Sequence, residues 1–289
     1  MMGFRRLWVA GVVTSSVLLS GQALPEPRKQ FGSSVTGAFE GWYENGDGTH
    51  GFLVGYYNRN TQQELDIPIG PNNRIDPGGP DLGQPTHFLP SRQFGMFAIP
   101  VPKGFTPEDK LTWTIYANGK NTSIPLRLHP DYLISPFSEI AVNNTPPVIR
   151  FEEHGASLQG PIATLTNAAV RTASLSEPLA LTIWVTDDMK YTSGTNAPMT
   201  KARPPVTLVW SKYRGSGSVT FDKTRPVVEQ TVATDNANAA FSGKATTNVK
   251  FSEAGEYVLH VTANDYSGDG GGGFQCCWTT GLVKVFVNP

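Results

Sequence analysis

The strongest constraint on the fold is a regular alternation of side chains near the C-terminus, between residues 256 and 263. The two alternating sets are Tyr257, Leu259 and Val261, and between them Val258, His260 and Thr262. A period of two is the signature of a β-strand, in which successive side chains point to opposite faces of a sheet. Gly255 supplies a turn before the strand, and the turn-forming pair Asn264-Asp265 ends it. This segment is therefore predicted to be part of a β-sheet.

The composition extends this prediction to the whole chain. The 289 residues include 30 glycines and 23 prolines, and sustained helical periodicity is absent. Such a composition suits short strands joined by many turns, which favours an all-β fold. The formal net charge is −1 without basic clusters, whereas binding to nucleic acid depends on neutralising phosphates. We therefore expect no nucleic-acid partner.

The first 23 residues have the pattern of a secretory signal peptide. Arg5 and Arg6 precede an uncharged, largely apolar run from Leu7 to Leu19, and the small residues Gly21 and Ala23 mark a cleavage site. The alternative is a buried helix, but two prolines follow at once and the run is too short to span a bilayer. The mature chain is therefore predicted to be secreted or periplasmic, without a transmembrane segment.

The remaining length suits two tandem β-sandwich domains better than one. The first is expected over residues 31–137, a linker over residues 138–147 and the second over residues 148–289. The first domain opens with a hairpin whose turn is Asn45-Gly-Asp-Gly48. Further strands are predicted at residues 64–67, 87–89, 93–101, 111–117 and 122–128. Two prolines stiffen the linker, so we expect the domains to be spaced along the chain.

Two aromatic residues of the hairpin, Trp42 and Tyr56, can share one face of the sheet. If they are exposed, they form a platform on which a sugar could stack, and they are candidate ligand-binding residues. If they are buried, they belong to the core of the sandwich, which is the commoner use of such rings.

A proline-rich segment from Pro68 to Pro85 is predicted to be a long loop, because proline at this density prevents regular ladder bonding. Its polar side chains are candidates for ligand binding: Asn72, Asn73, Arg74, Asp76 and Asp81. The alternative is a surface excursion that covers a sheet edge against unwanted pairing.

The two cysteines, Cys276 and Cys277, are adjacent. Cα atoms across a trans peptide are about 3.8 Å apart, whereas disulfides prefer about 4.4–6.8 Å, so a bond between them would be readily reduced. Three interpretations stay open: free thiols with one of them buried, a redox-active vicinal disulfide, and an intermolecular bridge or metal site. Phe274 and Trp278 flank the pair and could either dock a partner or pack on the domain.

The second domain carries a set of strand-like motifs. They are Thr145-Pro-Pro-Val148, Leu181-Thr-Ile-Trp-Val-Thr-Asp-Asp188, Val206-Thr-Leu-Val-Trp210, Phe251–Leu259 and Leu282-Val-Lys-Val-Phe-Val287. Together they resemble PKD-like domains, a family of immunoglobulin-like β-sandwiches. The resemblance covers roughly the second half of the chain, and insertions at residues 189–203 and 268–273 depart from the shorter repeats. It implies a module that holds, spaces or binds rather than one that catalyses.

Three aspartates of this domain, Asp187, Asp188 and Asp265, each follow a predicted strand. In immunoglobulin-like repeats such strand ends can converge near the linker, and carboxylate oxygens suit Ca²⁺, which extracellular modules often bind weakly. The alternative is that the aspartates end their strands through turns between side chain and backbone. Calcium is the one cofactor that the sequence suggests.

The sequence contains no recognised catalytic motif, because its histidines follow no metal-ligand spacing and it lacks a Gly-x-Ser-x-Gly elbow. Separated Asp and Glu residues could still meet in the fold as a glycosidase pair, so enzymatic activity stays open. The sequence favours a secreted, non-catalytic binding or scaffolding protein of the cell envelope that contacts a protein partner or a polysaccharide. The alternative is an extracellular carbohydrate-active hydrolase.

Overall fold

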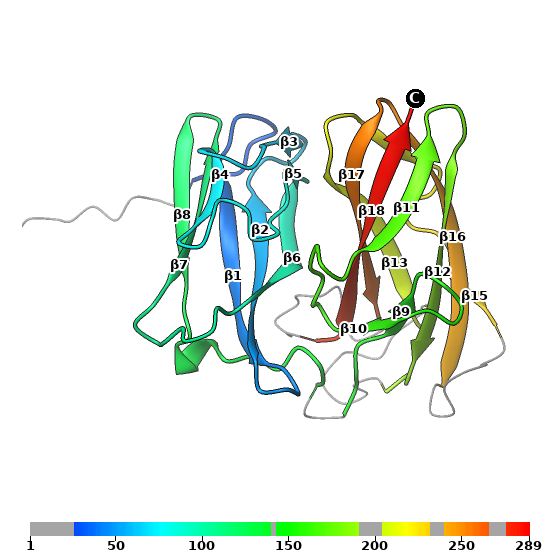
Figure 1. The fold of residues 1–289 in the computed structure, drawn as a ribbon, viewed down its shortest axis with the longest axis horizontal. Coiled ribbons are helices and arrows are strands. Elements are labelled where there is room, and N and C mark those ends of the chain that lie inside the picture. The colour runs from blue at the N-terminus through cyan, green and yellow to red at the C-terminus, as the bar shows by residue number, and fades with distance from the viewer. Residues whose placement is uncertain (1–25, 140–142, 191–203, 232–239, 266–275) are drawn as a thin grey trace, which may run out of the picture.

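The computed structural model describes residues 26–139, 143–190, 204–231, 240–265 and 276–289. These residues form two β-sandwiches that lie side by side, so the all-β prediction is confirmed (Figure 1). The predicted signal peptide, residues 1–23, lies outside the described residues. Within the described part of the chain, no helix is long and apolar enough to cross a membrane.

The first sandwich consists of two three-stranded sheets and a short ribbon. One sheet has the order β1 (Val35–Glu44), β2 (His50–Asn58), β6 (Ser91–Pro100), and the other has the order β4 (Asn73–Asp76), β7 (Leu111–Ala117), β8 (Lys120–Leu126). The ribbon pairs β3 (Leu65–Asp66) with β5 (His87–Phe88), and a 3₁₀ turn, η1, spans Pro130–Tyr132. The predicted hairpin is β1–β2.

A β-bulge in β1 sets which residues of the hairpin face the core. The register shifts between Phe39 and Gly41, so that Phe39 lies opposite Val54 and Trp42 lies opposite Phe52. Without the extra residue, Phe39 and Trp42 would point to opposite faces, because side chains alternate along a strand. With it, both pack against the core of the first sandwich.

The proline-rich segment contains a strand that the sequence did not predict. Residues 73–76 form β4 and pair with β7, so the expectation of a loop without ladder bonding is wrong for these four residues. The prolines flank β4 at Pro71 and Pro77 rather than interrupting it. Buried Asn73 holds the segment down, because its amide donates to the carbonyl oxygens of Ile67 and Pro85.

The second sandwich has the strand arrangement of an immunoglobulin-like domain. One sheet has the order β10 (Ser157–Gln159), β9 (Val148–Arg150), β12 (Leu179–Asp187), β16 (Phe241–Phe251), β14 (Val219–Phe221). A short strand, β15 (Glu229–Gln230), also pairs with β16. The other has the order β11 (Ala169–Ser174), β18 (Trp278–Asn288), β17 (Gly255–Asn264), β13 (Thr207–Arg214). Taken in chain order, β9, β12, β16 and β14 match strands A, B, E and D of that fold, and β13, β17 and β18 match C, F and G.

The two faces of β17 serve two different cores. Tyr257, Leu259 and Val261 are buried inside the second sandwich. Val258, on the other face, joins a hydrophobic cluster made mainly of first-domain residues, together with Leu282 of β18. The alternation in the sequence therefore marks a strand that is buried on both sides.

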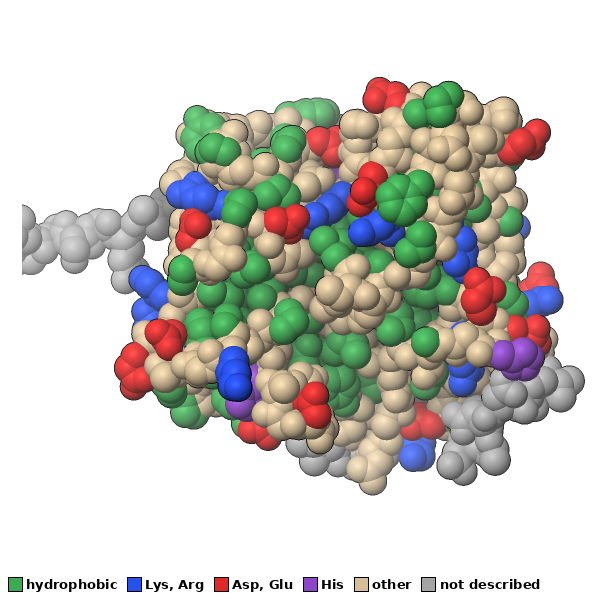
Figure 2. Space-filling model, in the orientation of Figure 1, with side chains coloured by type: hydrophobic (Ala, Val, Ile, Leu, Met, Phe, Trp, Pro, Cys, Tyr) green, Lys and Arg blue, Asp and Glu red, His purple; other side chains and the backbone are tan. Residues whose placement is uncertain are grey.

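The two domains pack directly against each other instead of being spaced by the linker. The Tyr213 hydroxyl donates to the Gly83 carbonyl at 2.5 Å, and the Ala98 amide donates to the Ala163 carbonyl at 3.0 Å. Arg214 forms a two-pronged ion pair with Asp81 at 2.8 and 2.9 Å. In the view of Figure 2, hydrophobic side chains continue across the boundary between the sandwiches, below a row of charged groups.

Candidate functional site

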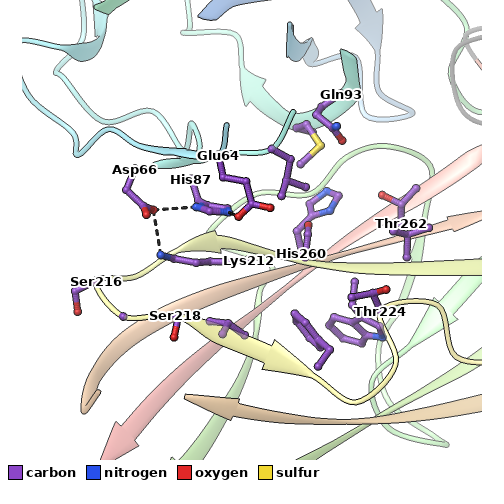
Figure 3. Close-up of a pocket in the computed structure, with 18 residues that line it drawn as sticks. Glu64, Asp66, His87, Gln93, Lys212, Ser216, Ser218, Thr224, His260 and Thr262 are labelled. Atoms are coloured by element: carbon purple, nitrogen blue, oxygen red, sulfur yellow. Dashed lines mark hydrogen bonds and ion pairs between the residues drawn. The ribbon is translucent and has the colours of Figure 1, made fainter. Parts of the chain in front are cut away.

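A groove lies between the two domains, where β6 of the first faces β13 and β17 of the second. Its larger part has a volume of about 490 Å³ and its smaller part about 300 Å³. The two parts adjoin, because Gln93, Met96, Val209 and Thr262 line both. We call this the interdomain groove (Figure 3).

One end of the interdomain groove is lined by charged groups that are bonded to one another. Nδ1 of His87 lies 2.9 Å from Asp66, and its Nε2 lies 3.3 Å from Glu64. Lys212 of the second domain reaches the same Asp66 carboxylate at 3.0 Å, so this network also ties the domains together (Figure 3). Because both nitrogens of His87 already face carboxylates, the imidazole has no free nitrogen with which to take a proton from a ligand.

The floor of the interdomain groove is a polar stripe on β17. His260, Thr262 and Asn264 occupy alternate positions, so they share the face that is turned towards the first domain. Burial lowers the pKa of His260 to about 4, and a hydrogen bond to the Met96 backbone opposes this only in part. The ring is therefore neutral near pH 7. Nε2 of the ring is buried and has no hydrogen-bond partner among the described residues.

The other end of the interdomain groove contains two arginines and two more unpartnered polar atoms. Arg92 is engaged, because its guanidinium lies 2.6 Å from the Glu40 carboxylate. Arg225 is exposed, and no hydrogen bond or ion pair holds it within the described residues. The indole nitrogen of Trp278 and the Oδ1 oxygen of Asn264 are both buried without a partner.

Three buried polar atoms therefore lie along one groove without hydrogen-bond partners: His260 Nε2, Asn264 Oδ1 and Trp278 Nε1. Buried polar atoms are usually satisfied, and each one left unpaired costs about 1–3 kcal/mol. Each of the three atoms has almost no accessible surface, so a molecule in the interdomain groove does not reach it in this conformation. What the groove offers to a polar molecule are its accessible side chains, among them Gln93, Ser218 and Thr262, and its chemistry differs between the two ends.

The predicted aromatic pair lies elsewhere, in the first sandwich. Tyr56 is fully buried and its hydroxyl accepts a hydrogen bond from the Leu89 amide. Trp42 is half-buried and its indole donates to the His129 carbonyl at 2.7 Å. Both rings pack on the core of the first sandwich, so the burial of Tyr56 favours the core interpretation over an open sugar platform.

The predicted loop residues mostly stabilise the fold and the contact between domains. Asn73 is buried, and Arg74 forms an ion pair with Asp76 at 2.9 Å. Asp81 is bound to Arg214 of the second domain, and exposed Asn72 accepts a bond from the Tyr116 amide through its carbonyl. None of the predicted residues of this loop lines the interdomain groove.

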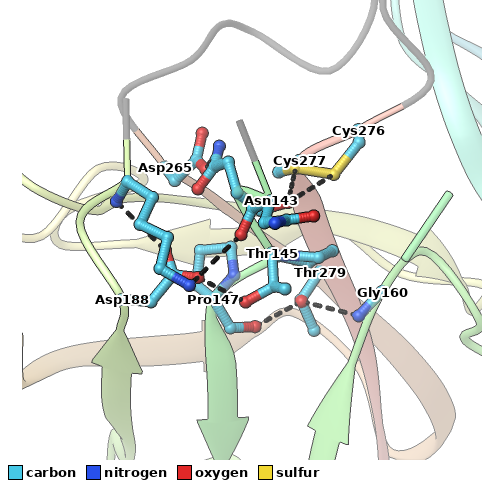
Figure 4. Close-up of a disulfide and its surroundings, with 12 residues drawn as sticks. Asn143, Thr145, Pro147, Gly160, Asp188, Asp265, Cys276, Cys277 and Thr279 are labelled. Carbon is cyan, nitrogen blue, oxygen red and sulfur yellow. Dashed lines mark hydrogen bonds and ion pairs between the residues drawn. A yellow bond between two sulfur atoms is a disulfide. The ribbon is translucent and has the colours of Figure 1, made fainter. Parts of the chain in front are cut away.

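Two of the predicted calcium ligands, Asp188 and Asp265, lie at one end of the second sandwich, near the linker (Figure 4), and the third, Asp187, is the last residue of β12. Asp188 accepts from Thr145 at 2.9 Å and lies 3.7 Å from the Lys190 ammonium, whereas Asp187 is buried. Burial raises the pKa of Asp187 to about 7, and the charges of Asp265 and Asp188 add to the shift. Among the described residues, no three His, Cys, Asp or Glu side chains are grouped so that they could hold a metal ion. Calcium binding at these aspartates stays a prediction.

The adjacent cysteines form a vicinal disulfide that is buried beside the linker (Figure 4). Cys277 lies 3.4 Å from the carbonyl oxygen of Asn144, whose side-chain amide donates to Asp265 at 2.7 Å. Of the flanking aromatic residues, Phe274 lies outside the described residues, and Trp278 lines the interdomain groove. Among the predicted ligand-binding residues that the structure describes, Trp278 alone lines the groove.

The remaining groove residues were not predicted, although the sequence held a signal for one group of them. The strand at residues 255–264 has one uniformly apolar face, and its other face places polar His260, Thr262 and Asn264 in a row. A buried strand with a polar stripe is unusual enough to mark a contact surface. No comparable pattern in the sequence marks Lys212 or Arg225 as residues of the groove.

No protein-family model matches the chain, and no curated protein matches its sequence. Two solved structures are weakly similar in fold. A titin fragment, A168–A169, is 14% identical with a TM-score of 0.23, and the match covers 88% of this chain and 99% of that one. A protein of unknown function from Porphyromonas gingivalis W83 is 10% identical with a TM-score of 0.22, covering 87% and 99%. These values are too low to support an argument, so the immunoglobulin-like assignment rests on the strand order.

Proposed function

We propose that this chain is a non-catalytic binding or scaffolding protein of the cell envelope, secreted or periplasmic, which holds a protein partner or a polysaccharide in the interdomain groove. The observation that carries the proposal is a groove between two tightly packed domains that is lined by accessible polar side chains, among them Gln93, Ser218 and Thr262. The resemblance of the second domain to PKD-like modules supports the same role.

The chemistry of the groove argues for binding rather than catalysis. His87 is held between two carboxylates, and Lys212 is nearly buried in its ion pair with Asp66. Groups fixed in this way orient the two domains but offer no free acid, base or nucleophile. A preformed groove lined by both apolar and polar side chains is, by contrast, suited to holding a ligand.

The test uses the mature chain, residues 24–289, immobilised and exposed to solubilised envelope protein and to purified envelope polysaccharide of the source organism. The variant Thr262→Trp fills the part of the groove that both ends share. Its matched control is Thr246→Trp, on the exposed face of β16 in the opposite sheet. We expect stoichiometric retention of one partner by wild type and the control, and loss in Thr262→Trp. Equal retention by all three proteins, or none by wild type, would contradict the proposal.

One observation favours the alternative, an extracellular carbohydrate-active hydrolase. Glu64 and Asp66 both line the groove, and both are held on the same imidazole. A glycosidase needs two carboxylates, and these two lie on one segment at the same end of the groove, where each would have to leave its contact with His87 to act. If they act as a pair, release of reducing sugar from the retained polysaccharide will be abolished in Glu64→Gln. Absence of any release by wild type would exclude the hydrolase.

A further inference from the structure

We infer that this chain forms a symmetric dimer, in which the outer edge of β11 pairs antiparallel with the same edge of a second copy. The strand lies at the end of its sheet, and within the described residues it pairs with β18 alone. Figure 1 shows β11 beside β18 in the second sandwich. The inference does not depend on the proposed function of the interdomain groove.

The backbone of β11 has unpaired hydrogen-bonding groups along its outer edge. The Leu175 amide, directly after the strand, donates to the Asn288 carbonyl of β18. Backbone groups alternate in direction along a strand, so the odd-numbered residues of β11 bond to β18 and the even-numbered ones face away from it. The residues that face away are Val170, Thr172 and Ser174. The Arg171 guanidinium, which also binds the Glu152 carboxylate at 2.6 Å, donates to the Val170 carbonyl at 2.9 Å. The other outward amides and carbonyls have no partner within the described residues, so they can bind a further strand.

Several other sheet edges of the described chain are closed or interrupted. On the edge strand β13, the Trp210 amide donates to the Thr224 carbonyl, and the Tyr213 carbonyl accepts from the Thr86 amide. The edge strand β8 contains Pro125, which has no amide hydrogen to donate. By contrast, β11 runs for 6 residues without proline, lysine or a shift in its register with β18. It therefore lacks the features by which edge strands usually avoid pairing.

The sequence of β11 is complementary to a second copy of itself running in the opposite direction. When Thr172 lies opposite Thr172 of the second copy, the two residues exchange both of their backbone hydrogen bonds. The Val170 amide then donates to the Ser174 carbonyl of the second copy, and the bond from Arg171 to the Val170 carbonyl stays in place. Arg171 lies opposite Ala173, so no like charges face each other. A pair of threonines at the centre is itself a favourable cross-strand combination.

Exposed apolar side chains beside this edge favour the same contact. Val170 is 57% exposed, and Phe286, which lies next to Thr172 in the register of β11 and β18, is 42% exposed. In the dimer the two Thr172 and the two Phe286 side chains form one row across the joined sheets, and neighbouring aromatic and β-branched side chains stabilise a sheet. Because β11 is short, the contact is small, and we expect a Kd on the order of 10–100 µM.

The experiment is sedimentation velocity of the mature chain, residues 24–289, at concentrations from about 1 to about 300 µM, which span this expected Kd. We expect wild type to pass from monomer to dimer. Thr172→Lys places two like charges opposite each other at the centre of the contact, so the Kd should rise about fivefold or more. An equimolar mixture of Thr172→Lys and Thr172→Glu should dimerise again, because opposite charges then face each other. The matched control is Thr246→Lys, an equally exposed threonine on the inner strand β16, which should dimerise like wild type.

The inference is overturned if wild type stays monomeric at the highest concentration, or if Thr172→Lys dimerises as tightly as wild type. It is also overturned if the mixture stays monomeric while both variants keep the wild-type melting temperature, because the two copies of residue 172 then do not meet. Equal loss of the dimer in Thr246→Lys would place the contact elsewhere and contradict it as well. None of these outcomes decides the proposed function, because no residue of β11 lines the interdomain groove.

Discussion

Two buried titratable residues of the second domain have pKa values displaced in favour of their neutral forms. Burial raises the pKa of Asp187 to about 7, and burial lowers that of His260 to about 4. Between about pH 4 and 7 the folded protein holds a proton on Asp187 that the unfolded chain releases, so this residue makes stability fall as pH rises. Between about pH 4 and 6.5 the unfolded chain protonates His260, so this residue makes stability rise with pH. The two trends oppose each other in wild type.

The variant Asp187→Asn separates these trends, because asparagine stays neutral at every pH. We expect its free energy of unfolding, relative to wild type, to increase between about pH 4 and 7 by at most about 1.4 kcal/mol per pH unit. Urea unfolding at four pH values across this range measures the difference. A difference that does not change with pH would show that Asp187 ionises as freely in the folded protein as in the unfolded chain.

The sequence could suggest that Asp187, Asp188 and Asp265 lie near one another, because each was expected to follow a strand. It could not indicate their different surroundings, since these depend on the linker. Asn144 packs over Asp265 and the disulfide, and Thr145 binds Asp188, while Asp187 is left buried with one unpartnered oxygen. The order of the strands brings the three aspartates close together, whereas the linker residues that cover this end of the sandwich decide which of them is buried.

At the scale of elements, periodicity predicted strands well where a strand has two unlike faces. It failed for β4, whose four residues lie between prolines, pair with β7 and are anchored to Ile67 and Pro85 by the Asn73 side chain. It also could not place the bulge at Gly41, because a single inserted residue leaves both flanking segments with a normal alternation. Long-range contacts decide such features.

Substitution of Gly41 tests whether the bulge in β1 tolerates a side chain. Gly41 has φ of +139°, and a Cβ atom there would lie 2.6 Å from the Tyr132 carbonyl oxygen. We expect Gly41→Ala to destabilise the protein by about 1–3 kcal/mol, because the strained backbone and the rigid neighbour both resist the methyl group. Gly46→Ala, in the turn of the same hairpin where a Cβ meets nothing within 4 Å, is the control and should have little effect. Thermal melting compares them, and equal melting temperatures would show that the bulge tolerates a side chain.

At the scale of the whole molecule, the sequence indicated two domains but not their contact. A linker with two prolines suggested separation, yet the packing of the domains is set by side chains that each sandwich turns outwards. Tyr213, Val258 and Leu282 of the second domain join the hydrophobic cluster of the first. Each lies on a strand whose other face fills its own core, and periodicity cannot tell a face turned to solvent from one turned to another domain.

This contact predicts that the two sandwiches unfold together. Leu282 and Phe286 point to the same face of β18, but Leu282 is 0% exposed at the interface, whereas Phe286 is 42% exposed beyond it. We expect Leu282→Ala to cost about 2–5 kcal/mol, because it leaves a cavity between the domains. Phe286→Ala should cost much less. Calorimetry should show one transition for wild type, with equal calorimetric and van't Hoff enthalpies, and a broadened or split transition for Leu282→Ala. Two separate transitions in wild type would mean that the domains are not coupled, and a groove between them could not be preformed.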